Sequence, residues 1–338
     1  MTIDRRPIGH TDIEVSPVAL GGWPITGITS LDVNEADNLA TVRACLDHGI
    51  NFVDTAYCYG ANGESEMLIR RALGERRNEM VIATKAGVHW EPDGSQTHDG
   101  RPETLKRECE ESLRRLGTDC VDLLYQHRPD PDVPVAESAG ALHSLMESGK
   151  TRSVGVSNFG VEHLEAFHAV CPISAYQPCY NMLQREIEAS TLPWCREHGV
   201  SVMVYWPLML GLLAGKLQRD HVFPARDGRA KYPMFQNEEY RKNLDFVDRL
   251  REVADEAGKT VAQVVINWTI HQVGITVAIC GAKRADQVAD NAGGMNWQLS
   301  SIQLAQINRV LEERGEPVTI SPSPAMSARA DGTPGRVE

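Results

Sequence analysis

An apolar run, INFVD at residues 50–54, is followed at once by TAYCYG at 55–60, so that an aspartate, two tyrosines and a glycine stand where the run ends. Ile50, Phe52 and Val53 are typical of a strand buried in a core, and the polar residues behind them are typical of a loop. We therefore expect a strand over 50–54 whose carboxyl end carries chemically active side chains.

The same unit, a short strand followed by a helix, recurs along the chain. The expected strands are 18–22, 50–54, 80–85, 121–127, 151–159, 173–181, 200–208 and 275–284, and the expected helices are 35–48, 65–73, 102–116, 135–147, 161–168, 187–198, 238–257 and one after 284. Continuous apolar strands are typical of parallel strands buried on both faces. Eight such units favour a (β/α)8 TIM barrel, whereas a doubly wound sheet would need a GxGxxG sequence after its first strand, which this sequence lacks.

We expect one α/β barrel domain over 1–317. A short β-hairpin that turns at 9–12 precedes the first strand, and a long insertion between strands seven and eight is typical of a functional loop. The last residues, 318–338, are rich in Pro, Ser, Ala and Gly, which predicts a flexible tail.

Composition narrows the classes of function. The 338 residues carry a net charge of -12, which disfavours a nucleic-acid partner. The eight cysteines are scattered without metal-ligand spacing, so we predict reduced thiols and no metal site. The sequence shows neither a signal-like segment nor a long apolar run, so we expect a cytoplasmic protein without membrane contact. The oligomeric state stays open.

Ionisable residues stand at the ends of three consecutive expected strands. These are Asp54, Lys85 and His127, and Tyr59 follows five residues after Asp54. Because the carboxyl ends of barrel strands open onto one mouth, we expect the four side chains to share a pocket. Taken singly, each also fits a structural role, as a turn cap, a solvated lysine, a core histidine or a rim aromatic.

The four side chains together would make an acid. A lysine ammonium about 4 Å from a phenol favours the phenolate by roughly 4 kcal/mol, so Lys85 would lower the pKa of Tyr59 towards neutrality. Asp54 would keep Lys85 charged and aimed, and His127 would donate a hydrogen bond to an oxygen that becomes negative.

Spaced motifs extend this pattern, and through them the chain resembles the aldo-keto reductase family over roughly residues 5–295. They are DTAYCYG (54–60), GESE (63–66), ATK (83–85), LLYQHRPDP (123–131), SVGVSNF (153–159), YQPCYN (176–181), VYWPLMLGLLAGK (204–216) and CGAKRADQVADN (280–291). The resemblance implies NADPH-dependent reduction of an aldehyde or ketone by hydride transfer. Tyr59 would be the general acid, Asp54 and Lys85 the pair that tunes it, and His127 the residue that orients the carbonyl.

The resemblance also implies a cofactor site. Ser157, Asn158 and Gln177 would hold the nicotinamide amide, and Tyr205 would stack on the nicotinamide ring. Gly281 and Ala282 would let the backbone approach the cofactor, and Lys283 and Arg284 would pair with an adenosine 2'-phosphate, which favours NADPH over NADH. The remaining expected contacts are Gln287 and Asn291 near the adenosine, and Pro207, Leu208, Gly211 and Lys216 over the pyrophosphate.

The substrate side departs from the family pattern. Arg128 stands where the family often has an aromatic residue, and it fits either an anionic substrate or an ion pair with Asp130 or Asp132. Trp23 and Tyr57 are expected pocket walls, with simple packing as the alternative. Few aromatic residues occur in the loops, which favours a small polar carbonyl or a sugar as substrate.

Two other functions stay open. Lys85 could be the Schiff-base lysine of a barrel aldolase, although a partner such as Asp54 would keep it charged. The chain could also bind NADPH as a regulatory or scaffold subunit, as some members of the family do.

Overall fold

Parallel strands close into a barrel in the computed structural model, which describes residues 4–27, 33–224 and 227–318. The barrel strands are β3 (Val18–Gly21), β4 (Phe52–Asp54), β5 (Val81–Ala86), β8 (Leu123–Gln126), β9 (Val154–Ser157), β10 (Ala175–Gln177), β11 (Ser201–Tyr205) and β12 (Ile275–Gly281). Each pairs in parallel with the next along the chain, and β12 closes the ring on β3. The predicted (β/α)8 barrel is therefore confirmed.

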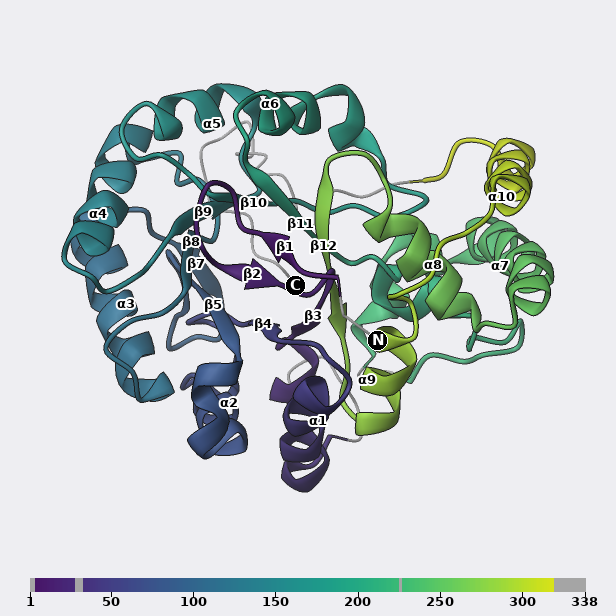
Figure 1. Ribbon diagram of the computed structural model, residues 1–338, viewed down its shortest axis with the longest axis horizontal. Helices are drawn as coiled ribbons and strands as arrows, with labels where there is room; N and C mark the ends of the chain where they lie inside the picture. The colour runs from purple at the N-terminus through teal and green to yellow at the C-terminus, as the bar shows by residue number, and fades with distance from the viewer. Residues whose placement is uncertain (1–3, 28–32, 225–226, 319–338) are drawn as a thin grey trace.

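Helices surround the strands (Figure 1). They are α1 (Glu35–Asp47), α2 (Glu64–Leu73), α3 (Pro102–Leu116), α4 (Val135–Glu147), α5 (Val161–His168), α6 (Thr191–Glu197), α7 (Asn237–Ala257), α8 (Val261–Ile270), α9 (Ala285–Ala292) and α10 (Ser301–Arg314). Short 3-10 helices are η1 (Pro24–Thr26), η2 (Gly74–Glu79), η3 (Glu186–Ala189), η4 (Met209–Ala214), η5 (Gly228–Lys231) and η6 (Pro233–Phe235). The predicted bounds of α3, α4 and α5 are confirmed.

The helix α3 illustrates why these segments are helical. Pro102 opens it, at a position where a backbone N–H would have no partner in the helix. Leu105, Cys109 and Leu116 lie on its inner face and are buried against the barrel. Gly117 ends it with φ of 68°, a left-handed conformation that favours glycine.

A hairpin closes the amino-terminal end of the barrel. It consists of β1 (Arg6–Pro7) and β2 (Glu14–Val15), which pair antiparallel as predicted, and Figure 1 shows it lying across the middle of the ring. Ile8, Ile13 and Val15 are buried in one apolar cluster with side chains from inside the barrel, such as those of Phe52 and Tyr125. The interior of the barrel is therefore filled by side chains from this end.

The predicted helix over 187–198 is wrong as a single helix. The chain forms η3, then breaks at Ser190, and starts again as α6. Pro193 lies in the first turn of α6, where its ring would clash with the carbonyl of residue 189 in a continuous helix. The break is the physical consequence of that proline.

The insertion between β11 and β12 holds more structure than the sequence predicted. The helix α7 is confirmed, but α8 was missed, and its side chains are buried on nearly all sides. Such a helix has no amphipathic period to reveal it. The signal was the capping box of Thr260 and Gln263, and Ser300 with Gln303 marks the start of α10, also missed, in the same way. Figure 1 shows α10 beside α7.

A second hairpin also escaped prediction. β6 (Val88–Trp90) and β7 (Gln96–His98) pair antiparallel directly after β5, so the hairpin stands at the carboxyl-terminal end of the barrel. Of the predicted tail over 318–338, all but Val318 lies outside the described residues. None of the helices described is both long and apolar enough to cross a membrane.

Candidate active site

The ends of β4 and β5 bring a lysine and an aspartate into contact inside the barrel mouth. The Nζ atom of Lys85 lies 2.5 Å from Oδ1 of Asp54 and donates to the backbone carbonyl of Thr55 at 2.8 Å. Its distance to the hydroxyl oxygen of Tyr59 is 3.4 Å. Both charged side chains are buried, so each stabilises the other against the cost of leaving water. The predicted contact of Asp54, Lys85 and Tyr59 is present.

Asp54 has a further partner on its other carboxylate oxygen. The side-chain amide of Gln177, at the end of β10, donates to Oδ2 at 2.7 Å. Burial raises the pKa of Asp54, and Lys85 and Gln177 act against that effect because they favour the carboxylate.

Tyr59 lies among aromatic rings. The ring of Trp23 meets it edge-on with centroids 5.1 Å apart, and His127 does so at 6.0 Å. The predicted lowering of the pKa of Tyr59 is wrong: burial raises it well above the ordinary value, and the negative charge of Asp54 acts in the same direction. The expectation rested on the charge of Lys85, whereas burial and the charge of Asp54 both act against a lower pKa of Tyr59. Tyr59 is therefore protonated at neutral pH, the form that a general acid needs.

His127 directly follows β8 and is neutral. Burial lowers its pKa well below the ordinary value, and the charges of Lys85 and Arg128 add to that effect. Its backbone is held at both ends, because the N–H donates to the carbonyl of Ala86 at 2.9 Å and the carbonyl accepts from Asn158 at 3.2 Å. A neutral imidazole can still donate one hydrogen bond to a carbonyl oxygen.

The ends of β9, β10 and β11 supply a polar wall. Ser157 donates to the backbone carbonyl of Gln177 at 2.8 Å, and the hydroxyl of Tyr205 donates to Oδ1 of Asn158 at 2.7 Å. Asn158 has φ of 64°, a left-handed conformation that asparagine tolerates better than most residues. The residues expected at the nicotinamide are thus together, although the amide nitrogen of Gln177 is engaged by Asp54.

The residues expected at the cofactor phosphates gather where β12 ends. Gly281 pairs in register with Gly21 of β3, so two residues without side chains adjoin there. Arg284 precedes α9, whose first turn has no side-chain cap. An uncapped helix start with a neighbouring lysine and arginine fits a phosphate group. The donor set is therefore right for a nicotinamide dinucleotide.

Most of the residues expected at the cofactor phosphates and adenosine already have partners within the protein. Gln287 accepts from the backbone N–H of Lys283 at 2.9 Å, Asn291 donates to the carbonyl of Gly281 at 3.5 Å, and Ala282 is buried. Arg284 makes an ion pair with Asp286 at 3.0 Å and is half-exposed.

The segment after β11 has unusual backbone geometry. Pro207 and Leu208 lead into η4, in which Met209 and Leu210 have φ of 46° and 54° and Gly211 has φ of 89°. Such conformations cost energy in non-glycine residues and are typical of functional loops. The segment ends near α9, because Lys216 pairs with Asp290 at 3.0 Å.

The expected substrate residues differ in position. Trp23 adjoins Tyr59, as a pocket wall should. Tyr57 instead faces α3, where its hydroxyl donates to Glu111 at 2.7 Å and Arg115 covers its ring at 4.2 Å, which favours packing. The charge of Arg128 acts on both Tyr59 and Tyr205, so it lies near the barrel mouth.

The sequence assigned no role to three residues next to the site. The indole N–H of Trp90 donates to the backbone carbonyl of Cys58 at 2.8 Å, and Sγ of Cys58 lies 3.6 Å from Nδ1 of His127. His98 of β7 affects the pKa of His127. The signal that would have revealed Trp90 and His98 is Gly94, a hairpin glycine between two short strands that end with Trp90 and His98 respectively.

A comparison with protein-family models matches residues 17–312 to the Aldo/keto reductase family. The chain belongs to the aldo-keto reductase family. Relatives of known sequence include the aldo-keto reductase YhdN of Bacillus subtilis, 36% identical over 313 residues (92% of this chain and 94% of that protein). The probable aldo-keto reductase 1 of Glycine max is 33% identical over 301 residues (89% of this chain and 86% of that protein).

Solved structures of aldo-keto reductases share the fold. The glycerol dehydrogenase AKR11B4 from Gluconobacter oxydans superimposes with a TM-score of 0.87 at 36% identity, covering 96% of this chain and 99% of that one. The holo form of the aldo-keto reductase AKR11C1 from Bacillus halodurans gives a TM-score of 0.75 at 26% identity, covering 91% and 96%. As an aldo-keto reductase, the chain is an oxidoreductase that reduces carbonyl compounds with a nicotinamide cofactor, NADH or NADPH.

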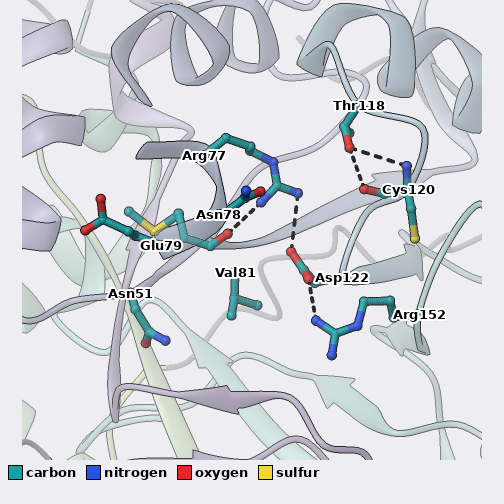
Figure 2. A pocket seen from close by; sticks show the side chains of 10 residues that line it. Asn51, Arg77, Asn78, Glu79, Val81, Thr118, Cys120, Asp122 and Arg152 are labelled. Atoms are coloured by element: carbon teal, nitrogen blue, oxygen red, sulfur yellow. Dashed lines mark hydrogen bonds and ion pairs between the residues drawn. The ribbon is translucent and has the colours of Figure 1, made fainter. Parts of the chain in front are cut away.

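Two cavities of this aldo-keto reductase lie at the opposite end of the barrel. One, of about 340 Å³, is lined by Asn51, Arg77, Asn78, Glu79, Met80, Val81, Thr118, Cys120, Asp122 and Arg152 (Figure 2). The other, of about 510 Å³, adjoins the β1–β2 hairpin. In barrel enzymes this end serves stability, and the chemistry is at the carboxyl ends of the strands. Neither cavity is the active site.

Proposed function

We propose that this aldo-keto reductase uses NADPH to reduce small polar aldehydes or ketones, with Tyr59 as the general acid. The observation that carries the proposal is the contact of Lys85 with both Asp54 and Tyr59 at the mouth of the barrel. It supplies a protonated phenol beside a fixed positive charge, which is what a carbonyl oxygen needs as it becomes an alkoxide.

When bound, a nicotinamide cofactor would supply a hydride for the carbonyl carbon, whose π electron pair would move to the carbonyl oxygen. The O–H bond of Tyr59 then breaks and its proton forms the new O–H bond of the alcohol. An alkoxide is a far stronger base than a phenolate, so this transfer is favourable even with a raised pKa of Tyr59. The Lys85 ammonium stabilises the phenolate that is left, and solvent returns the proton.

The other residues bind and orient. His127 would donate its hydrogen bond to the carbonyl oxygen, and Ser157, Asn158 and Tyr205 would hold the nicotinamide end of the cofactor. The linked hydrogen bonds of these residues favour that role, because side chains locked by their neighbours lose little entropy on binding.

The preference for NADPH rests on Lys283 and Arg284. Arg284 is paired with Asp286, but an exposed ion pair is worth only about 0–1 kcal/mol, so a 2'-phosphate with two negative charges can replace the carboxylate. The guanidinium fork matches the geometry of a phosphate.

A small polar substrate is supported by two observations. The glycerol dehydrogenase from Gluconobacter oxydans shares 36% identity with almost the whole chain. Arg128 also brings a positive charge close to Tyr59, which favours polar or anionic groups next to the carbonyl. The Schiff-base alternative is disfavoured, because the 2.5 Å contact with Asp54 holds Lys85 as an ammonium, which is not a nucleophile.

Binding and turnover test the proposal together. Quenching of tryptophan fluorescence by NADPH and NADH gives the affinities, and NADPH oxidation is followed with glyceraldehyde, dihydroxyacetone, a sugar, benzaldehyde and an aliphatic ketone. We expect tighter binding of NADPH, turnover of the small polar carbonyls, and a loss of kcat of at least about 100-fold in Tyr59→Phe with binding retained. NADPH binding without turnover of any carbonyl would instead favour a regulatory subunit.

A further inference from the structure

Cys58 lies between the two tyrosines of the loop after β4 and touches the catalytic histidine. Its Sγ atom is 3.6 Å from Nδ1 of His127, and its side chain is 2% exposed. It belongs to a small apolar cluster with Ala56 and Val88, against which Trp90 and Tyr59 pack. The thiol side of this contact is therefore shielded from water, which favours even a weak hydrogen bond there.

Both partners of this contact are held by their backbones. Trp90 donates to the carbonyl of Cys58 at 2.8 Å, and the N–H of Tyr59 donates to the carbonyl of Ala56 at 3.0 Å, so the loop is fixed on either side of the thiol. His127 is fixed through its own N–H and carbonyl. What these bonds leave undetermined is which ring nitrogen of His127 carries the proton.

The direction of the hydrogen bond follows from the two protonation states. Burial raises the pKa of the Cys58 thiol to about 12 and lowers that of His127, so both groups are neutral at pH 7. A thiol sulfur is a weak acceptor, whereas the unprotonated nitrogen of an imidazole is a good one. The favoured arrangement has the S–H of Cys58 donating to Nδ1 of His127, which places the imidazole proton on Nε2.

We propose that Cys58 is a positioning residue that holds His127 in the Nε2–H tautomer, with Nε2–H left to donate to the carbonyl oxygen of the substrate. This inference rests on the proposed function, in which His127 orients that oxygen. With the proton on Nδ1, Nε2 would carry a lone pair instead of a hydrogen-bond donor. That lone pair would repel the carbonyl oxygen as the oxygen becomes negative.

Charges around the pair decide how the effect depends on pH. The groups that act on His127 are Lys85, Arg128 and His98, and those that act on Cys58 are Lys85, Glu108 and Glu66. Burial, together with the charges of Lys85 and Arg128, keeps His127 neutral whether or not Cys58 is present. Replacement of Cys58 should therefore change the height of the pH–kcat profile between pH 6 and 8 and leave its shape unchanged.

The test compares Cys58→Val, an apolar side chain one carbon larger that has no donor, with Cys58→Ser, whose hydroxyl is a stronger donor. Cys171→Val is the matched control, because Cys171 is buried in the main apolar core between α5 and β10. We expect kcat to fall about five- to tenfold in Cys58→Val, the size expected for one hydrogen bond, with the affinity for NADPH unchanged. Cys58→Ser should restore kcat to within about twofold, and the control should match wild type.

Nitrogen NMR of histidine-labelled protein with NADPH bound reads the tautomer without any substrate. The resonances of His127 are identified by their loss in His127→Gln. We expect the Nε2–H form in wild type and Cys58→Ser, and a shift towards Nδ1–H in Cys58→Val. An Nδ1–H wild type, or a Cys58→Val protein with unchanged tautomer and kcat, would overturn the inference.

Failure of the proposed function gives a different result. If wild type bound NADPH but reduced no carbonyl, the reductase assignment would fail while the NMR spectra still showed whether Cys58 sets the tautomer. If Cys58→Val lost NADPH binding or its circular-dichroism spectrum changed, Cys58→Ser alone would decide, since a wild-type tautomer and kcat in that variant support the donor role and an Nδ1–H tautomer contradicts it.

Discussion

The side-chain amide of Gln177 donates a hydrogen bond of 2.7 Å to Oδ2 of Asp54, and this bond crosses the barrel. Four pairings separate β10 from β4 in either direction around the ring, so the two strands face each other. Both side chains are buried. The bond therefore ties opposite walls together directly beneath the reacting groups.

Loss of this bond should destabilise the fold. Gln177→Leu removes the donor and leaves a buried carboxylate oxygen with one partner fewer, so we expect the free energy of unfolding to fall by about 1.5–3 kcal/mol, the range for a hydrogen bond to a charged group. Urea unfolding measures it. In an Asp54→Ala background the same change should cost less than about 0.5 kcal/mol. Equal costs in both backgrounds would show that the bond contributes nothing.

Acid should destabilise the protein through His98 and His127. Burial lowers the pKa of His98 to about 4, with the charge of Arg128 adding to it, and lowers that of His127 further below its ordinary value. In the unfolded chain the two histidines take up protons near pH 6.5, and in the folded chain they do so only at lower pH. The stability of the fold is therefore not reduced by these histidines above about pH 6.5. It falls as the pH drops from there towards their pKa values in the folded chain.

Urea unfolding of wild type and His98→Gln at pH 7 and pH 5 checks this sign. We expect both to lose stability at the lower pH, and the variant to lose less. His48→Gln is the control, since this exposed residue follows α1 on the outside of the barrel. A larger acid loss in His98→Gln than in wild type would contradict the assignment.

The cofactor preference should depend on Arg284. Arg284→Ser is expected to raise the KM for NADPH about tenfold and leave that for NADH within about twofold, because only NADPH carries the 2'-phosphate. Steady-state kinetics with both cofactors measure the change. Arg249→Ser removes the same charge from an exposed ion pair with Glu313 and should change neither value. A parallel rise for both cofactors would place Arg284 elsewhere than at the 2'-phosphate.

The amino-terminal end of the barrel should matter for stability alone. Asp122 accepts from Arg77 at 3.4 Å, from Arg152 at 2.9 Å and from the backbone N–H of Ile82 at 2.9 Å, and Figure 2 shows it between the two arginines. Asp122→Ala leaves all three donors short of a partner, so we expect a loss of about 2–4 kcal/mol in unfolding free energy with kcat/KM unchanged.

The exposed Asp12 provides the control for this variant. It also pairs with Arg152, but its side chain is 88% exposed, so Asp12→Ala should cost less than about 0.5 kcal/mol. A fall in kcat/KM of correctly folded Asp122→Ala would mean that the two ends of the barrel are coupled.

The sequence was sufficient to predict the barrel because the pattern of apolar residues in its strands and helices is periodic and recurs along the chain. Short apolar strands and amphipathic helices such as α3 can be recognised from the spacing of their apolar residues. The carboxyl ends of parallel strands necessarily lie on the same side of the barrel. That geometry alone predicts that Asp54 and Lys85 lie together. What spacing does not contain is the burial of a helix on all sides, which hid α8, or the effect of one proline, which divided the segment around Ser190.

The electrostatics of the site were harder to predict from the sequence than the fold. The sign of the pKa shift of Tyr59 depends on burial and on the distance of Asp54, and neither can be read from a motif. Gln177 was assigned to the cofactor, and its bond to Asp54 arises from two strands that are distant in sequence. Contacts of this kind exist only once the barrel has closed.

That closure has a consequence for the order of events during synthesis. Arg6 donates to the backbone carbonyls of Ile270, Ile275 and Thr276, which are made about 265 residues later. The amino-terminal hairpin must therefore wait for the last barrel strand before it can dock, and until then the growing chain is a sheet with two open edges. In this protein, a hairpin that is translated before every strand of the barrel is among the last segments to find its place.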